Sequence, residues 1–235
     1  MKALLLSAGF GKRLGSITSK TPKCLLKING IEILELWITK LKALGVEEFI
    51  INTHFLHEQI EKFASSHALS QKIRIVYEER LLGTAGTIRE NGRYFSDHTF
   101  IVHSDNLCDD DLTNMVKKYH SRPKHCLATM LTFKPKSIVG CGLLKTDNND
   151  VMIDYQEKPK CSDLTIANGA VFLVSKGFLS KISNEHPNAH DLCADVIPQM
   201  NKLINCYHTT GTFLDIGTPE TLKLASVLCK RDMTD

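Results

Sequence analysis

The sequence lacks the long hydrophobic runs and the strong charge that would indicate a membrane protein or a nucleic-acid-binding protein. No part of its 235 residues approaches the roughly 18 consecutive apolar residues of a transmembrane helix. The formal net charge is only +3, which is too small by itself to indicate nucleic-acid binding. The apolar stretch Ala3–Leu6 is also too short for the core of a signal peptide. We therefore expect a cytoplasmic protein with no nucleic-acid or membrane partner.

The cysteines and histidines also lack the spacing that is typical of metal sites and disulfide frameworks. The eight cysteines include no CxxC pair, and no Cys/His grouping has the spacing of a zinc finger. We expect scattered, reduced thiols that serve as small apolar side chains. A chain of this length can bury a sizeable core without such cross-links.

What the first half does contain is a regular alternation of strand and helix patterns. Short apolar runs predict strands at residues 2–7, 48–53, 72–77 and 99–103. Helical patterns lie between or after them, at residues 34–44, 56–63, 84–94 and 110–120. Strands that alternate with helices of this length indicate βαβ units and a mostly parallel sheet flanked by helices.

The second half changes character. Strand-like segments follow one another with few helices between them, at residues 126–133, 142–144, 151–156 and 170–174. Two helices are then predicted at about 176–183 and 191–203, a short strand pair at 204–208 and 212–216, and a last helix from Pro219. No repeat or linker interrupts the chain. We predict one domain, residues 1–235, of the α/β class, with a smaller, partly antiparallel half that binds substrate.

The loop after the first strand reads SAGFGKRL and runs from Ser7 to Leu14. Open α/β sheets bind ligands at the carboxyl ends of their strands, and glycine lets backbone N–H groups approach a phosphate. The P-loop pattern GxxxxGK[ST] is absent, and Leu14 stands where a dinucleotide fingerprint has its third glycine. Taken alone, the loop fits a phosphate-binding segment and a tight turn equally well.

Three further charged residues favour the phosphate interpretation. Lys23 follows Pro22, which restricts the backbone and can direct the lysine toward the same loop. Asp105 follows the fourth predicted strand, and Asp215 lies next to the end of the last short one. From such positions two carboxylates can hold Mg²⁺ together with substrate phosphates. A turn or a helix cap would explain either aspartate by itself.

Seven stretches, in this order, resemble the motifs of the sugar-1-phosphate nucleotidyltransferases: LLLSAGFGKRL, TPKCLLKING, EERLLGTAGTI, HSDN, YQEKP, ANGAVF and DIGTPE. The resemblance extends from residue 1 to about residue 225. It implies a Rossmann-like α/β fold and a reaction in which an NTP and a sugar 1-phosphate give an NDP-sugar and pyrophosphate. The implied partners are these two substrates, the implied cofactor is Mg²⁺, and a homo-oligomer is left open.

The resemblance also implies roles for individual residues. It places the nucleotide against Ser7, Ala8, Gly9, Gly11, Glu78, Gly83 and Thr84, with Arg13 and Lys23 as catalytic, phosphate-binding cations. It assigns Mg²⁺ to Asp105 and Asp215, and the sugar phosphate to Glu157, Lys158, Asn168 and Gly169. A sugar 1-phosphate oxygen is already ionised at neutral pH, so the reaction needs alignment and charge neutralisation rather than a general base.

Glu78 leads to a prediction about the base. It aligns with a base-facing position that is glutamine in many uridylyl-, thymidylyl- and adenylyltransferases. An ionised carboxylate only accepts hydrogen bonds, and guanine presents two adjacent donors. We therefore predict GTP, with a mannose or heptose 1-phosphate. If Glu78 instead points to solvent, the expected reaction is uridylyl transfer to a hexose 1-phosphate.

Some positions depart from the family pattern. Cys193 stands where many members have a sugar-facing glutamate, Ser7 replaces a common alanine or glycine, and Ser104 replaces the usual glycine. These departures bear on the choice of sugar more than on the reaction. Two alternatives remain open: a cytidylyltransferase for a non-sugar phosphate, and a non-catalytic nucleotide-binding regulatory subunit.

Overall fold

The structure is a computed structural model, and it describes residues 1–228. Contacts within the chain divide it into two compact units. The N-terminal unit comprises Lys2–Leu81, Val102–Asp110 and the chain from Gly211, and the central unit comprises Leu82–Ile101 and Asp111–Thr210 with Met1. Whether these units act as a single domain over residues 1–235 stays a prediction.

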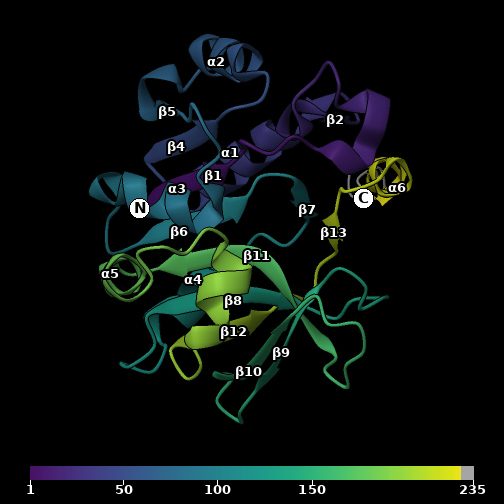
Figure 1. Ribbon diagram of the computed structural model, residues 1–235. Coiled ribbons are helices and arrows are strands. Elements are labelled where there is room, and N and C mark those ends of the chain that lie inside the picture. Colours follow the sequence, from purple (N-terminus) through teal and green to yellow (C-terminus); the bar gives the residue numbers. More distant parts are fainter. Residues whose placement is uncertain (229–235) are drawn as a thin grey trace. The chain divides into compact units, whose positions relative to one another are not determined.

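The N-terminal unit contains three adjacent parallel strands: β1 (Lys2–Leu6), β4 (Glu48–Thr53) and β5 (Ile73–Tyr77). Figure 1 shows them in purple and blue, with α2 (His57–Ser66) close to β5. Helix α1 (Ile33–Ala43) lies between β1 and β4 in the sequence and ends shortly before β4. Its Trp37 and Leu41 side chains are buried. Residues 3–5 of β1 are completely buried, as expected for a parallel strand that is covered on both faces.

Two small antiparallel pairs complete the N-terminal unit. Strands β2 (Lys27–Ile28) and β3 (Ile31–Glu32) form a tight hairpin, and β7 (Asn106–Cys108) pairs with β13 (Phe213–Asp215). Helix α6 (Pro219–Leu228) follows, so the predicted start of the last helix at Pro219 is confirmed. The β7–β13 pair brings the segment after residue 211 beside the segment after β6 (Thr99–His103), which contributes residues to both units.

The central unit is partly antiparallel. Its strands are β8 (Ala128–Phe133), β9 (Gly142–Thr146), β10 (Met152–Glu157), β11 (Ile166–Val174) and β12 (Ile204–His208). Strand β11 runs antiparallel to β8 and β9, β10 runs antiparallel to β9, and β12 runs parallel to β8. The helices are α3 (Gly83–Asn91), α4 (Thr113–His120) and α5 (Lys176–Glu185). The predicted fold class, a mixed α/β sheet flanked by helices, is confirmed.

Two local predictions are wrong. The predicted strands at 204–208 and 212–216 do not pair with each other. Instead, β12 pairs with β8 and β13 pairs with β7. The predicted helix over 191–203 is instead a short π-helix, Leu192–Val196, followed by a 3-10 turn that ends at Gln199. Pro198 lacks the N–H that a continuous α-helix would use, which accounts for the break.

No helix within residues 1–228 has both the length and the apolar character needed to cross a membrane. A cytoplasmic location stays a prediction.

Candidate active site

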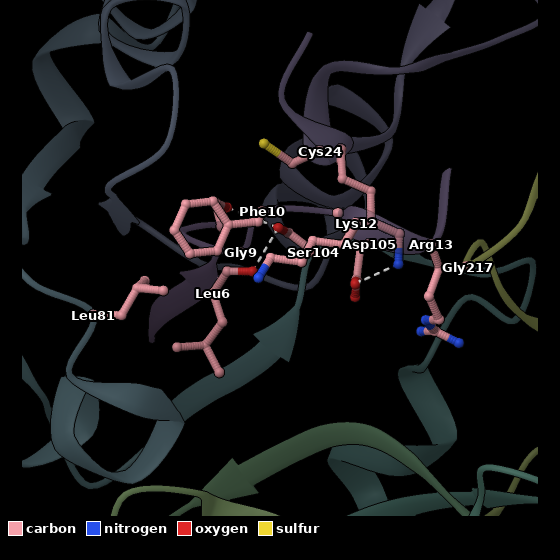
Figure 2. A pocket seen from close by; sticks show the side chains of 13 residues that line it. Leu6, Gly9, Phe10, Lys12, Arg13, Cys24, Leu81, Ser104, Asp105 and Gly217 are labelled. Atoms are coloured by element: carbon pink, nitrogen blue, oxygen red, sulfur yellow. Dashed lines mark hydrogen bonds and ion pairs between the residues drawn. The ribbon is translucent and has the colours of Figure 1, made fainter. Parts of the chain in front are cut away.

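A cavity of about 420 Å³ lies in the N-terminal unit where β1 ends. The loop after β1 supplies much of its wall, together with residues that follow β5 and β6 and the segment before α6. The lining residues are Leu6, Ser7, Gly9, Phe10, Gly11, Lys12, Arg13, Lys23, Cys24, Leu81, Ser104, Asp105 and Gly217. In Figure 2, Phe10 and Leu81 lie toward one side of the cavity, and Asp105 and Arg13 toward the other. The cavity therefore has an apolar side and a charged side.

Glycine gives the loop after β1 its shape. Gly11 has a φ of 64°, a left-handed conformation that side chains disfavour, and its carbonyl oxygen accepts hydrogen bonds from the Leu14 N–H and the Thr18 hydroxyl. A Cβ at Gly9 would meet no atom within 4 Å. Packing inside the protein therefore does not require glycine at residue 9, whereas a ligand that approaches the backbone closely would.

Two cations and two carboxylates meet at the charged side. The Lys23 ammonium donates to Asp105 Oδ2 at 2.5 Å and lies 3.4 Å from Asp215 Oδ1. The Arg13 guanidinium reaches Asp215 Oδ2 at 3.2 Å. The Lys23 side chain is 9% exposed, whereas that of Arg13 is 67% exposed. The predicted grouping of Arg13, Lys23, Asp105 and Asp215 is therefore present in the structure.

The β7–β13 pair explains why two aspartates that are 110 residues apart converge. Asp215 lies opposite Asn106, the residue after Asp105, and the Ile216 N–H donates to the Asp105 carbonyl oxygen at 3.3 Å. Burial alone would raise the pKa of the Asp105 carboxyl, but the charges of Lys23 and His103 and its hydrogen bonds hold that pKa below its usual value. Asp105 is therefore ionised at neutral pH.

These residues fit a divalent cation of the Mg²⁺ type. Both carboxylates already approach one positive charge, the Lys23 ammonium, and Mg²⁺ typically takes one or two carboxylates and fills its other positions with water and substrate phosphates. Within the described part of the chain, no group of three or more His, Cys, Asp or Glu side chains is arranged to hold a metal by itself. A metal at Asp105 and Asp215 would thus depend on water and the substrate phosphates for the rest of its ligands.

A hydrogen-bonded chain supports the loop from behind. The Ser7 N–H donates to Asn52 Oδ1 at 2.7 Å, and Asn52 Nδ2 donates to Glu78 Oε1 at 2.9 Å. The Ser7 hydroxyl also lies 2.7 Å from the Ser104 hydroxyl, which donates to the carbonyl oxygen of Leu6. Ser7 is thus fixed to β4 through its backbone and to the end of β6 through its side chain.

Two predicted nucleotide-binding residues do not belong to the cavity wall. Glu78 is only 5% exposed, so it does not point to solvent, and it lies behind the loop as the partner of Asn52. Ala8 is buried as well. Direct contact of either residue with a nucleotide stays a prediction.

Gly83 and Thr84 begin α3 in the central unit. Gly83 has a φ of 74°, and a Cβ there would collide with the backbone oxygen and ring of His190. The Thr84 hydroxyl accepts a hydrogen bond from the Leu192 N–H at 2.6 Å. These contacts account for both residue types by packing within the central unit, and their role toward a nucleotide stays a prediction.

The predicted sugar-phosphate residues lie close together in the central unit. Lys158 Nζ is 3.1 Å from Glu157 Oε1, and this hydrogen bond raises the pKa of Lys158 despite its partial burial. Glu157 is linked to Asn168 through the hydroxyl of Tyr155. Gly169 is buried directly after Asn168. The grouping of Glu157, Lys158 and Asn168 is observed, and their role stays a prediction.

Sequence reasoning missed several residues of these sites. Asn52 is the second-last residue of the buried strand β4, and a polar residue near a strand end was the available signal. Tyr155 lies two residues before Glu157 and so shares its strand face. Cys24 also lines the cavity, and no pattern in the sequence indicated this. Burial raises the pKa of its thiol to about 12, so the thiol is uncharged at neutral pH.

The fold and the cavity define an α/β protein with a glycine-rich loop, two cations and two carboxylates around one cavity. The sequence profile described as "Nucleotidyl transferase" matches residues 2–230. The chain therefore belongs to the nucleotidyl transferase family, which confirms the resemblance and the class of enzyme inferred from the motifs.

Individual relatives are similar over nearly the whole chain. The D-glycero-alpha-D-manno-heptose 1-phosphate guanylyltransferase of Campylobacter jejuni is 26% identical over 220 residues, which are 94% of this chain and 96% of that protein. The UTP–glucose-1-phosphate uridylyltransferase of a Synechocystis species is 29% identical over 217 residues, which are 85% of this chain but only 55% of that protein. The crystal structure of HddC from Yersinia pseudotuberculosis complexed with GMP-PN is similar in fold, with a TM-score of 0.79 at 20% identity, over 97% of this chain and 99% of that one.

Proposed function

We propose that this protein transfers a nucleotidyl group from an NTP to a sugar 1-phosphate. An anionic oxygen of the sugar 1-phosphate attacks the α-phosphorus of the NTP, the bond between the α-phosphorus and its bridging oxygen breaks, and pyrophosphate leaves. The observation that carries the proposal is the convergence of Lys23, Arg13 and two carboxylates beside a glycine-rich loop, in a chain of this family. It provides the charge neutralisation that this reaction requires.

The cavity of the N-terminal unit is the proposed site of the NTP. Its charged side suits the phosphates, with Arg13 and Lys23 as donors and the loop Ser7–Gly11 close to them. Mg²⁺ at Asp105 and Asp215 would neutralise the triphosphate. With both carboxylates holding the metal, the Lys23 ammonium, which now pairs with them, would be available to donate to a phosphate oxygen. Phe10 and Leu81 then offer apolar surface for the base.

The cluster in the central unit is the proposed site of the sugar phosphate. Lys158 is the cation for its phosphate group, and the Glu157 carboxylate and the Asn168 amide suit the hydroxyl groups of a sugar. No general base is needed, because the attacking oxygen is already ionised. The sugar that we favour is a mannose or heptose 1-phosphate, and similarity to a heptose 1-phosphate enzyme over nearly its full length supports this choice.

For the base, we favour guanine. The buried Glu78 carboxylate is a fixed acceptor next to the loop, and a bidentate pair with guanine would be worth about 1–3 kcal/mol of discrimination. UTP is the runner-up, because a uridylyltransferase is among the similar proteins. Glu78→Gln separates two roles. If Glu78 binds guanine, the ratio of GTP to UTP turnover falls by about 5- to 150-fold; if it serves only to hold Asn52, both NTPs slow down equally.

The deciding experiment is a matrix of the four NTPs against sugar 1-phosphates and phosphocholine, read by release of pyrophosphate. We expect the highest kcat/KM with GTP and a mannose or heptose 1-phosphate. Faster release with UTP for every sugar overturns the guanine assignment alone. Turnover of CTP with phosphocholine indicates the cytidylyltransferase alternative. Nucleotide binding without any pyrophosphate release indicates a regulatory subunit and contradicts the proposed reaction.

A further inference from the structure

Three strands of the central unit meet around one glycine. Tyr155 and Glu157 lie two residues apart on β10 and therefore on the same face of the sheet. The register places Glu157 opposite Gly142 of β9. A Cβ at Gly142 would collide with the Tyr155 hydroxyl and lie 2.6 Å from Glu157 Oε2. Only glycine therefore lets both side chains lie across β9.

The Tyr155 hydroxyl uses this space to connect β10 with β11. It donates to Glu157 Oε2 at 2.6 Å and accepts from Asn168 Nδ2 on β11 at 3.3 Å. The second contact of Asn168 Nδ2 is the Cys193 sulfur at 3.3 Å, and Asn168 Oδ1 accepts from the Ala170 N–H at 2.7 Å. The Asn168 amide is thus held at both ends, and Tyr155 joins it to the carboxylate.

The direction of this hydrogen-bonded chain is fixed by protonation. Burial, together with the nearby Cys193 and Glu157, raises the pKa of the Tyr155 phenol above its usual value, so the group keeps its proton at neutral pH. Burial and the carboxylates of Glu157 and Asp191 raise the pKa of the Cys193 thiol to about 12. Tyr155 therefore donates to Glu157, and Asn168 must donate to Tyr155.

We propose that Tyr155 is a positioning residue that holds Glu157 and Asn168 in the orientation that the sugar phosphate requires. The inference rests on the proposed function, because it takes Glu157 and Asn168 as the sugar-binding groups. Tyr155 is 6% exposed and acts through its neighbours rather than on the substrate. Without its hydroxyl, Glu157 loses a donor and keeps only its contact with Lys158, and Asn168 loses the acceptor that links it to Glu157, so the orientation of each group is less restricted.

Tyr155→Phe tests the inference, with Tyr119→Phe as the matched control. Tyr119 is a fully buried tyrosine of the same unit, and its hydroxyl donates to the Asp97 carbonyl oxygen at 2.6 Å. Each variant loses a buried hydroxyl that donates one hydrogen bond, so a fall in Tm is expected for both, and a somewhat larger fall for Tyr155→Phe, whose hydroxyl also accepts from Asn168. Only Tyr155→Phe should raise the KM for the sugar 1-phosphate, by about tenfold, with an unchanged KM for the NTP.

Gly142→Ala provides an independent perturbation, because its methyl group displaces the same hydroxyl and carboxylate. We expect the same selective rise in the KM for the sugar phosphate. The inference is overturned if Tyr155→Phe leaves that KM unchanged in an otherwise active enzyme, if it raises both KM values equally, or if Tyr119→Phe has the same effect. If the wild-type protein uses no sugar 1-phosphate at all, the proposed function fails and the inference fails with it.

Discussion

The cavity of the N-terminal unit and the polar cluster of the central unit are built in opposite ways. The cavity combines opposite charges, and Arg13 and Asp215 are 67% and 51% exposed. The cluster around Tyr155 is held by a hydroxyl, an amide and a thiol, and Tyr155 and Cys193 are almost fully buried. Ion pairs connect the charged side chains of the cavity, whereas directed hydrogen bonds connect Glu157, Tyr155 and Asn168 beside the Glu157–Lys158 ion pair of the cluster.

This difference predicts how each site responds to change. The ion pair between the exposed Arg13 and Asp215 side chains contributes only about 0–1 kcal/mol, so the cavity can exchange it for contacts with phosphates and a metal at little cost in stability. Buried hydrogen bonds are costly to leave unmade, at about 1–3 kcal/mol for a stranded group. We therefore expect substitutions in the cavity to act on turnover, and substitutions in buried hydrogen-bonded groups to act on stability and binding.

The largest effect is expected for Asp105→Asn. Loss of one carboxylate removes half of the proposed metal site and a partner of Lys23, so kcat should fall by about 10²–10³-fold or more. The fold should persist, because Asn keeps the shape of the side chain. Circular dichroism and steady-state pyrophosphate release at saturating Mg²⁺ measure the two properties. Asp163→Asn, at an exposed position, is the control, and near-normal kcat in Asp105→Asn would remove the metal assignment.

The next largest effects distinguish the residues that bind the NTP from those that bind the sugar phosphate. Arg13→Ala should lower kcat strongly, with Arg13 acting on the triphosphate, whereas Lys158→Ala should raise the KM for the sugar phosphate by roughly 10-fold or more and change the KM for the NTP little. Kinetics with each substrate varied in turn measure both. If Lys158→Ala impaired only the use of the NTP, the assignment of the two sites would have to be exchanged.

A smaller effect is expected where the cavity itself depends on buried hydrogen bonds. Asn52→Ala removes the acceptor of the Ser7 N–H and the donor to Glu78, and both groups are buried. The free energy of unfolding, measured with urea, should fall by about 2–4 kcal/mol. Asn188→Ala, at an exposed position, should change it by less than about 0.5 kcal/mol. Equal stability of the two variants would show that the hydrogen bonds connecting Ser7, Asn52 and Glu78 do not support the loop.

The smallest effect concerns thiol chemistry. The pKa of about 12 keeps Cys193 protonated at pH 8, and its side chain is buried, whereas Cys161 is exposed. The thiolate is the reactive form, and its fraction falls tenfold for each unit by which the pH lies below the pKa. Iodoacetamide at pH 8 should therefore label Cys161 long before Cys193, as followed by peptide mass spectrometry. Labelling of both cysteines at one rate would mean that the cluster is open to solvent.

The sequence predicts those features whose signals are local. Apolar patterns identified β1, α1, β4 and most of the longer strands and helices to within a few residues. The loop and Asp105 were found because polar residues follow apolar strands, and Lys23 because it follows Pro22. Strand partners were less predictable, because pairing of β13 with β7 depends on residues about 100 positions apart. Tyr155 was missed for a similar reason: its role depends on the space above Gly142, which no pattern in β10 reveals.

The central claim is that the reaction occurs at the α-phosphorus, and an NTP labelled there with ³²P tests it most directly. With wild-type protein, Mg²⁺, labelled GTP and mannose or heptose 1-phosphate, the label should appear in a phosphatase-resistant NDP-sugar, with unlabelled pyrophosphate released in equal amount. Omission of the sugar phosphate, or chelation of the metal, should stop the transfer. If the label stays in GTP, GDP or GMP with every sugar phosphate and every labelled NTP tested, the proposed nucleotidyl transfer is contradicted.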